Sequence, residues 1–488
     1  MQRARPSEQS KSDHLFEEGD PSTPGERAMD LLKRNPDYAL HCVDPDTGYG
    51  LLYSQKRGDC AFLNPLATAL WRAATDSLDS SLAAHLFSES MNISGSEEYL
   101  MGVISDLRKK GLLLPADAGA MQEPSPQGPV KQNHSLGQVY LYATKECNAR
   151  CFHCYQPTQR VESSARERQA GQITPEAFLQ LVEQGLPLGL KSIKITGGEP
   201  LLRSDLGTII RGARKLGVHV SIETNGFLVD EAFANLLAEN DVDVSISLDG
   251  GSAAVHDTLR GLPGSFDRVT RALRLLSGRG RKPKVIMAVS HRNLGEVEGV
   301  LGVASGNGCH LVKLNPVNTL GLAQRLVRQK VLLTVKEIVA LYEKRKEFES
   351  RFGIFIYVEG PPAFASLYEM VSGHAAICPF TQILGVLSDG SISFCGIGNS
   401  CPELILGRID EKGFSLARFW HEAEALVEVR KVLTRGLQGV CARCVLEPFC
   451  KGSCRALAYG DFKSFAAPHP WCQSAYDEGI FPSQYLTQ

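Results

Sequence analysis

The sequence lacks the features that mark membrane, secreted and nucleic-acid-binding proteins. No apolar run approaches the ~20 residues that a membrane-spanning helix needs. The N-terminus, Met1-Gln2-Arg3-Ala4-Arg5-Pro6, is not followed by the apolar stretch of a signal peptide. The formal net charge of -2 gives no overall field that would attract nucleic acid or an anionic membrane. We therefore expect a cytoplasmic protein with neither nucleic acid nor a membrane among its partners.

Cysteine, by contrast, is abundant. Fourteen cysteines in a chain without a secretion signal indicate metal or redox chemistry rather than disulfides. Three of them fall between Cys147 and Cys154, and eight fall between Cys378 and Cys472. The remaining three stand alone, and we expect them to pack as small apolar side chains: Cys42, Cys60 and Cys309.

The length of 488 residues predicts two or three domains, and changes in composition suggest where they begin and end. The chain starts with a polar stretch that is typical of disordered segments. A second stretch, rich in Pro, Gly, Gln and Ser, predicts a linker. The predicted segments are a disordered tail (1–28), a small module (29–115), a linker (116–136), an α/β body (137–365) and a cysteine-rich region (366–488).

The small module is predicted to hold a sheet followed by three helices. Strand-like segments surround the turn Asp44-Pro45-Asp46-Thr47-Gly48, and apolar residues then recur at helical spacing. The expected strands are Tyr38–Val43, Gly50–Tyr53 and Ala61–Leu63, and the expected helices are Leu66–Ala74, Ser80–Leu86 and Ser96–Lys110.

Strands and helices alternate through the α/β body, which predicts a parallel sheet with right-handed crossovers. The expected strands are Gln138–Tyr142, Ser192–Thr196, His219–Glu223, Val242–Leu248, Lys284–Val289 and His310–Asn315. The expected helices are Thr174–Gln184, Ser204–Leu216, Asp230–Glu239, Ser265–Ser277 and Glu296–Ser305. A further strand is expected at Ile354–Val358.

A C-x3-C-x2-C motif, formed by Cys147, Cys151 and Cys154, directly follows the first of these strands. Three thiolates fit a cubane [4Fe–4S] cluster and leave one iron open to a cofactor or substrate. The loop leaves the carboxyl end of a strand, where α/β barrels place their chemistry. A zinc loop is the alternative, but zinc requires a fourth ligand nearby.

These residues resemble the radical S-adenosylmethionine (radical SAM) enzymes, which carry C-x3-C-x2-C after the first barrel strand. The form C-x-H-C-Y is common among the members that modify peptides. The resemblance implies a partial (β/α)6 barrel, and it implies that the open iron binds SAM. A SAM-binding role is implied for seven residues: His153, Gly197, Gly198, Glu199, Pro200, Ser247 and Arg260.

The motifs after the second, fourth and sixth strands support that resemblance. In Gly197-Gly198-Glu199-Pro200, glycines permit close backbone approach and the carboxylate can pair with an ammonium group. Gly251 looks like a one-residue insertion before Arg260. The end of the sixth strand, Asn315-Pro316-Val317-Asn318, is expected to face the adenine. No residue stands out as a catalytic acid or base.

The cysteines of the C-terminal region resemble the SPASM domain of radical SAM maturases, which holds two auxiliary [4Fe–4S] clusters. The resemblance implies three clusters in all. It assigns one auxiliary cluster to Cys441, Cys444, Cys450 and Cys472, and the other to Cys378, Cys395 and Cys454. Cys401 is either a further ligand of the second cluster or a free thiol. Structural zinc is the alternative, since C-x2-C also suits that metal.

The small module resembles the PqqD-like domain that recognises precursor peptides, related to the chaperone of pyrroloquinoline quinone biosynthesis. The resemblance rests on the order of strands and helices, on the helix start Leu63-Asn64-Pro65 and on the closing Leu107-Arg108-Lys109-Lys110-Gly111-Leu112-Leu113. The alternative is a winged helix with another use.

Together these resemblances imply a radical SAM enzyme that installs a thioether or carbon crosslink in a ribosomally made precursor peptide by means of a 5′-deoxyadenosyl radical. The implied partners are the precursor peptide or protein and a reductase such as flavodoxin or ferredoxin. Alternatives are a maturase of an enzyme subunit, a maturase of a small molecule such as a haem precursor, and a non-enzymatic, zinc-clustered interaction protein. Sulfatase maturation is disfavoured, because Gly396 stands where those enzymes have an aspartate.

Overall fold

The computed structural model describes most of the chain and divides it into two compact units. The described residues are 31–74, 78–79, 96–115, 134–160, 171–375 and 377–487. One unit comprises 37–68 and 123–488, and the other comprises 1–36 and 69–122. The predicted tail, the predicted helix near Ser80–Leu86 and most of the predicted linker lie outside the described residues.

The larger unit is built on a sheet of ten strands. Seven of them run parallel and follow the order of the sequence from one strand to its neighbour. The two strands that end the sheet do not pair with each other, so the sheet remains open. The seven strands are β7 (Gln138–Tyr142), β10 (Ser192–Thr196), β11 (His219–Thr224), β12 (Asp243–Ser247), β13 (Lys284–Val289), β14 (Leu311–Pro316) and β15 (Phe355–Val358).

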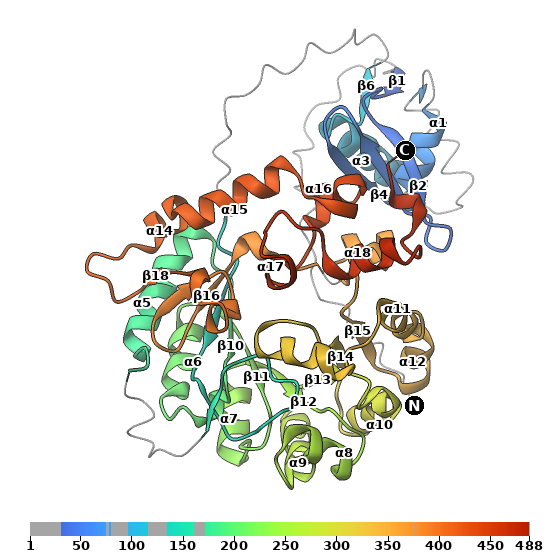
Figure 1. Cartoon of the computed structure of the whole chain (residues 1–488). Helices are drawn as coiled ribbons and strands as arrows, with labels where there is room; N and C mark the ends of the chain where they lie inside the picture. The colour runs from blue at the N-terminus through green and yellow to red at the C-terminus, as the bar shows by residue number, and fades with distance from the viewer. Residues whose placement is uncertain are drawn as a thin grey trace, which may run out of the picture. The chain divides into compact units, whose positions relative to one another are not determined.

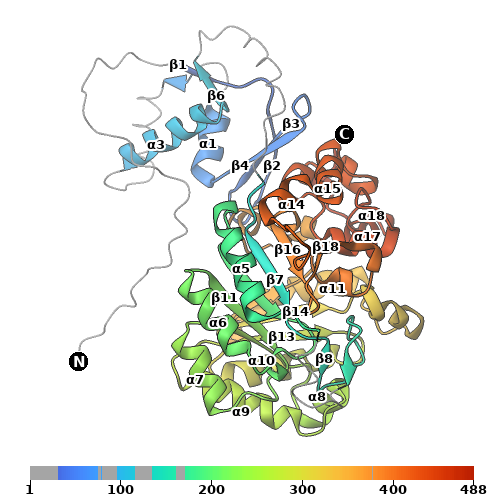
Figure 2. The same cartoon turned by 90° about the vertical axis from the view of Figure 1, so that its left-hand side faces the viewer.

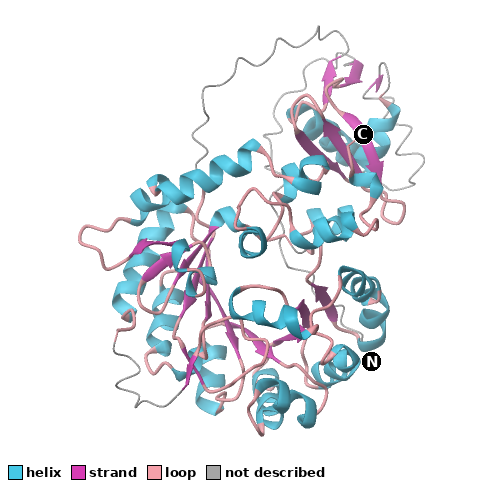
Figure 3. Ribbon diagram, viewed as in Figure 1, coloured by secondary structure: helices cyan, strands magenta, loops and turns pink. Residues whose placement is uncertain are grey.

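Helices connect these strands and lie outside the sheet (Figures 1 and 3). They are α5 (Pro175–Gly185), α6 (Leu206–Lys215), α7 (Glu231–Glu239), α8 (Ala253–Arg260), α9 (Ser265–Ser277), α10 (Val297–Gly306), α11 (Val335–Glu343) and α12 (Arg345–Phe352). This arrangement confirms the predicted α/β body with a central parallel sheet. The five predicted helices correspond to α5, α6, α7, α9 and α10. Helix α8 was not predicted, because its residues were interpreted only as a cofactor motif.

The parallel strands alternate between apolar and polar side chains. The buried face carries apolar residues that are completely buried in the main hydrophobic core: Val139 and Leu141 of β7, Ile193 and Ile195 of β10, and Val220 and Ile222 of β11. Lys194 and Glu223 point to the opposite face and remain partly accessible. Because parallel strands covered on both sides are usually almost wholly apolar, this alternation indicates that the inner face lines a polar cavity.

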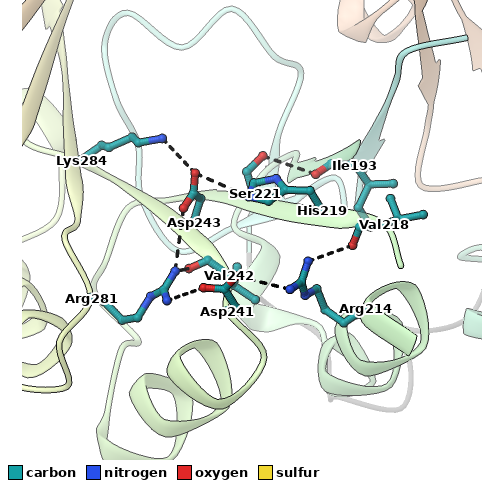
Figure 4. A network of polar contacts seen from close by, with 10 residues as sticks. All are labelled: Ile193, Arg214, Val218, His219, Ser221, Asp241, Val242, Asp243, Arg281 and Lys284. Carbon is teal, nitrogen blue, oxygen red and sulfur yellow. Dashed lines mark hydrogen bonds and ion pairs between the residues drawn. The ribbon is translucent and has the colours of Figure 1, made fainter. Parts of the chain in front are cut away.

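A network of surface ion pairs joins the amino ends of the strands (Figure 4). Asp243, at the start of β12, accepts a hydrogen bond from Lys284 at 3.0 Å and lies 3.7 Å from His219. Asp241 accepts one from Arg281 at 2.5 Å. Exposed pairs of this kind contribute little stability individually. They lie at the end of the barrel opposite to the predicted site.

The cysteine-rich region continues the sheet of the α/β body. Strand β16 (Ile383–Val386) pairs in parallel with β7, and β17 (Ser391–Ser393) and β18 (Ile405–Arg408) follow in antiparallel order. Strands on both sides of the domain boundary predicted at residue 365 therefore belong to one sheet. These three strands, of three or four residues each, were not among those predicted from the sequence.

Short helices complete the C-terminal region (Figure 2). Arg455 is completely buried and donates to the carbonyl oxygens of Gly452, Phe465 and Ala467, which ties together the segments that carry the last cysteines. The helices are α13 (Leu367–Val371), α14 (Leu416–Glu422), α15 (Glu424–Arg435), α16 (Glu447–Cys450), α17 (Arg455–Phe462) and α18 (Pro470–Asp477).

Part of the predicted N-terminal module belongs to the larger unit. The antiparallel strands β2 (Ala39–Val43), β3 (Gly50–Ser54) and β4 (Asp59–Leu63) form a separate sheet. The ring of Phe62 packs edge-on against Phe449 at 4.7 Å between centroids. His41 forms a hydrogen bond with the carbonyl oxygen of Gln484 at 2.6 Å.

The smaller unit contains a sheet that the sequence did not predict. Strand β1 (Leu31–Arg34) pairs with β5 (Leu78–Asp79) and β6 (Leu113–Pro115), and α3 (Ser96–Lys109) belongs to the same unit. Helix α1 (Pro65–Ala73) spans the division between the units. The winged-helix-like identity of the module remains a prediction. Among the described helices, none has the length and apolar character needed to cross a membrane.

Candidate active site

A cavity of about 280 Å3 opens at the carboxyl ends of the parallel strands. It brings together most of the residues predicted to bind a cluster and SAM. The predicted residues in its wall are Cys147, Cys151, His153, Cys154, Gly197, Gly198, Ser247 and Arg260. Glu199 and Pro200, also predicted to bind SAM, are not among the residues that line it.

The loop that carries the three cysteines is held in place by its neighbours. The backbone N–H of Ala149 donates to Cys147 Sγ at 3.4 Å, and Arg260 donates to Cys151 Sγ at 3.5 Å. The N–H of Arg150 also donates to the carbonyl oxygen of Arg260 at 2.8 Å. Hydrogen bonds to sulfur stabilise thiolate ligands and tune cluster potentials.

Asp249, two residues beyond the end of β12, contacts two of the predicted SAM-binding residues. Its carboxylate lies 2.7 Å from Nε of Arg260 and 3.6 Å from Nε2 of His153. Burial would raise the pKa of Asp249, but Arg260 and then His153 hold it below its usual value. Burial lowers the pKa of His153 to about 4, so its ring is neutral at neutral pH. Sequence reasoning missed Asp249, although it belongs to the motif Ser245-Ile246-Ser247-Leu248-Asp249-Gly250.

Glu199 has a different environment from the one predicted. It is completely buried and accepts hydrogen bonds from Thr224 Oγ1 at 2.6 Å, the N–H of Asn225 at 2.8 Å and the N–H of Leu201 at 3.0 Å. Burial raises the pKa of Glu199 above its usual value. In this structure its carboxylate joins the loops that follow β10 and β11, rather than facing the cavity.

The two glycines before Glu199 allow the loop after β10 to touch the cysteine loop. A Cβ atom on Gly198 would lie 2.0 Å from the carbonyl oxygen of Glu146, and Gly197 has a φ of 130°. The N–H of Gly198 donates to the carbonyl oxygen of Thr144, and the N–H of Glu199 donates to that of Glu146. The glycines are therefore required by contact between the two loops as well as by any bound cofactor.

The cavity also offers an acceptor that the protein leaves unsatisfied. Asn315 Oδ1, at the end of β14, is buried without a hydrogen-bond partner, and Asn315 lines the cavity. Such a group is costly unless a ligand or water satisfies it. The cavity fits a [4Fe–4S] cluster with SAM, because it offers three thiols, a guanidinium, glycine-containing loops and an unsatisfied acceptor.

The four cysteines assigned to one auxiliary cluster line a second, small cavity. Gly452 and His469 lie in the same wall, and the N–H of His469 donates to Cys441 Sγ at 3.5 Å. Burial raises the pKa values of these thiols, which favours the protonated form while no metal is bound. Because thiolates are the ligands, metal binding releases these protons. The cysteines are Cys441, Cys444, Cys450 and Cys472.

Cys378, Cys395 and Cys454 lie close enough to influence one another electrostatically. Burial, and then the thiols of Cys454 and Cys395, raise the pKa of Cys378 well above its usual value. The N–H of Leu457 donates to Cys454 Sγ at 3.4 Å. Cys401 is buried and influences Cys395 more weakly than Cys454 does. Its role as a ligand stays a prediction.

Each of the three cysteine groups thus has a backbone N–H directed at one of its sulfurs. Within the part of the chain that the structure describes, no three His, Cys, Asp or Glu side chains converge as ligands of one metal ion do.

Residues 141–302 match the family model described as the Radical SAM superfamily, so this part of the chain is a radical SAM domain. An AdoMet-dependent heme synthase of Methanosarcina barkeri is 25% identical over 349 residues, which cover 67% of this chain and 94% of that protein. A PqqA peptide cyclase of Rhizobium meliloti is 25% identical over 337 residues, covering 67% and 84%.

Among solved structures, SuiB of Streptococcus suis bound to its precursor peptide SuiA is similar, with a TM-score of 0.56 and 14% identity. The match covers 91% of this chain and 100% of SuiB. At this identity the similarity establishes the fold alone. With the superfamily match, it shows that the protein has the α/β fold of radical SAM enzymes.

Proposed function

We propose that this protein is a radical SAM enzyme that modifies a ribosomally made precursor peptide, forming a thioether or a carbon crosslink. The observation that carries the proposal is one cavity that unites three cysteines with the glycine loop, Ser247 and Arg260 at the ends of parallel strands. When bound, SAM and the cluster supply a 5′-deoxyadenosyl radical that abstracts a hydrogen atom from a C–H bond.

The protein's own residues have distinct tasks in this proposal. Cys147, Cys151 and Cys154 hold the SAM-binding cluster. Arg260 is fixed by Asp249 and directed at Cys151, and Asn315 accepts a hydrogen bond from the cofactor. The barrel walls exclude water from the reacting atoms.

Two similarities support a peptide substrate. One relative is a PqqA peptide cyclase, and the similar structure of SuiB contains a precursor peptide. The two C-terminal cysteine groups support two auxiliary clusters, as in SPASM maturases. The electron donor in this proposal is a reductase such as flavodoxin or ferredoxin.

Sulfatase maturation is not favoured. A Cβ atom on Gly396 would lie 2.0 Å from the hydroxyl of Tyr142, so an aspartate has no space directly after Cys395. A haem precursor is the second candidate substrate, because an AdoMet-dependent heme synthase is among the relatives.

The cofactor assignment is tested with Cys151→Ala and the matched control Cys309→Ala. Cys151 lines the cavity. Cys309 is a buried thiol of the hydrophobic core, and in the sequence it lies far from every predicted cluster ligand. Anaerobically reconstituted protein with Cys309→Ala should form 5′-deoxyadenosine from SAM under dithionite. The Cys151→Ala protein should form none, and continued formation would contradict the assignment.

The substrate class is tested by co-expression with short reading frames beside the gene, followed by mass spectrometry. A loss of two hydrogens from an encoded peptide, absent with Cys151→Ala, is the expected result. Conversion of a haem precursor under the same conditions, with every peptide unchanged, would favour the haem alternative.

We also propose that residues 29–115 recognise the precursor by a PqqD-like mode. A protein lacking residues 1–115 should still cleave SAM but should modify the full-length precursor poorly. Since that deletion also removes the strands that contact Phe449 and Gln484, iron content must be measured in parallel. An unchanged modification rate would contradict the proposed role.

A further inference from the structure

The inner face of the barrel carries two similar groups, each made of a lysine, a glutamate and a tyrosine. Lys194 on β10 donates to Glu223 Oε1 at 3.1 Å, and its ammonium lies 5.0 Å from the ring centroid of Tyr140 on the neighbouring strand. Lys194 thus contacts both a carboxylate and an aromatic ring, and both stabilise its charge.

The second group repeats this arrangement on the last two parallel strands. Lys313 on β14 lies 3.2 Å from Glu359, and its ammonium lies 5.4 Å from the ring centroid of Tyr357. Lys313 and Tyr357 are paired in the register of β14 and β15, just as Lys194 and Tyr140 are paired in that of β10 and β7.

The carboxylates of both groups face the active-site cavity. Glu223 and Glu359 line the cavity that contains the three cysteines of the C-x3-C-x2-C motif, whereas the two lysines do not belong to its wall. The side chains of Glu223 and Glu359 are 35% and 32% exposed, respectively. Oxygen acceptors are therefore available to a molecule in the cavity.

The same groups extend toward the auxiliary cysteines. Glu359 raises and Lys313 lowers the pKa of Cys378, after the larger effects of burial and of the neighbouring thiols. The pKa of Tyr140 is raised by burial first, and then by Cys378 and Glu223. Lys313 and Glu359 therefore lie near Cys378, a cysteine of one auxiliary group.

We propose that Glu223 and Glu359, each neutralised by its own lysine, form the pocket for the residue that the enzyme modifies, and that this residue has an uncharged side chain with a hydrogen-bond donor. The inference rests on the proposed function and specifies the substrate of that site. Ionised carboxylates only accept hydrogen bonds, so the group that binds them must donate.

The balance of charge disfavours ionised substrate groups. Two ammonium groups and two carboxylates give the pocket no net charge. A cationic substrate group would add a charge that no free carboxylate of the pocket balances, and an anionic one would also face two carboxylates. Amide, hydroxyl, thiol and indole groups donate without this cost.

The test compares Glu223→Gln and Glu359→Gln with the matched control Asp243→Asn. Asp243 forms an equivalent pair with Lys284 at 3.0 Å, but at the amino ends of the strands and outside the cavity wall (Figure 4). Each substitution removes one carboxylate charge with little change of shape. The control therefore accounts for the general effect of breaking a lysine–carboxylate pair in this barrel.

Binding is measured without turnover, on SAM-loaded holoenzyme lacking reductant. The probes are three blocked tripeptides, N-acetyl-Gly-Xaa-Gly-amide with asparagine, lysine or aspartate in the centre, observed by saturation-transfer NMR. The asparagine peptide should bind the wild type and Asp243→Asn equally. It should bind Glu223→Gln and Glu359→Gln about tenfold more weakly, as expected for loss of a charge-assisted hydrogen bond.

The lysine and aspartate peptides should bind weakly to all four proteins. Equal binding of the asparagine peptide to all four proteins would overturn the proposal. So would preference for a charged peptide, or the absence of saturation transfer from every peptide. Wild-type SAM cleavage under dithionite tests the proposed function separately, since it requires no peptide.

The modified precursor provides a second measurement. Tandem mass spectrometry of the co-expressed peptide should place the hydrogen loss on a residue with an uncharged donor side chain. Modification at Asp, Glu, Lys or Arg would overturn the pocket assignment while leaving the peptide-maturase function intact.

Discussion

Gly198 allows two loops to come into contact because it has no side chain. Since a Cβ atom there would lie 2.0 Å from the carbonyl oxygen of Glu146, a side chain must push the cysteine loop away. We expect Gly198→Ala to weaken SAM binding about tenfold or more, which corresponds to ~1.4 kcal/mol. Equilibrium dialysis with labelled SAM measures the change.

The control for this substitution is Gly295→Ala. A Cβ atom on Gly295 would meet no atom within 4 Å, so that protein should bind SAM as the wild type does. Equal affinities of the two variants would show that the contact with Glu146 is not needed.

Asp249 is expected to have both a structural and a binding role, and the two can be separated. Asp249→Asn leaves the buried Arg260 without its carboxylate, a change that costs about 3–5 kcal/mol in comparable pairs. The melting temperature of the holoenzyme should fall and SAM binding should weaken.

The double variant Asp249→Leu with Arg260→Met distinguishes these effects. Replacing both charges by apolar groups should recover much of the melting temperature, because no unpaired charge remains. SAM binding should stay weak, because Arg260 is absent. Recovery of SAM binding in the double variant would show that Arg260 does not contribute to cofactor binding.

At the scale of elements, α11 begins with a capping box that also binds a histidine. Thr334 and Glu337 exchange the side-chain and backbone hydrogen bonds of this motif, and Glu337 also contacts His291 Nε2 at 2.9 Å. The hydrogen bond to Glu337, followed by that to the carbonyl oxygen of Lys330, raises the pKa of His291.

This contact predicts a dependence of stability on pH. The folded protein holds the His291 proton more tightly than the unfolded chain does. Its contribution is thus fully present below the unfolded pKa of about 6.5 and is lost as pH rises through the higher folded value. NMR titration should show the pKa of His291 falling in Glu337→Gln, which keeps the capping geometry. An unchanged pKa would contradict the coupling.

The elements also show what the sequence could reveal. Strand β10 was predicted to the residue, because its apolar and polar residues alternate and a glycine pair ends it. Strand β16 was not, since four residues give no periodicity and its partner β7 is distant in sequence. Likewise, the family resemblance implied which cysteines belong together, and Cys441, Cys444, Cys450 and Cys472 line one cavity. Asp249 and the partners of Glu199 became recognisable only when strand ends were brought together.

At the scale of the whole molecule, three separate cysteine groups predict the iron content. Reconstituted protein should contain about twelve irons per chain, four in each cluster. Cys450→Ala, in the cavity shared by four cysteines, should remove about four of them and leave SAM cleavage under dithionite intact. Iron analysis and electron paramagnetic resonance measure the loss.

The control for this prediction is Cys60→Ala, which removes a cysteine predicted to bind no iron. Its iron content should equal that of the wild type. Loss of all iron from Cys450→Ala, or about four irons in the wild type, would contradict the assignment of three independent clusters.

The pairing of β16 with β7 has a consequence for biosynthesis. Strand β7 emerges from the ribosome early, but one of its edges stays open until Val386 has been translated. At ordinary elongation rates this delay is on the order of tens of seconds. An open strand edge can pair with another nascent chain. A transcript cut short between these strands would therefore yield an aggregating fragment rather than a smaller working barrel.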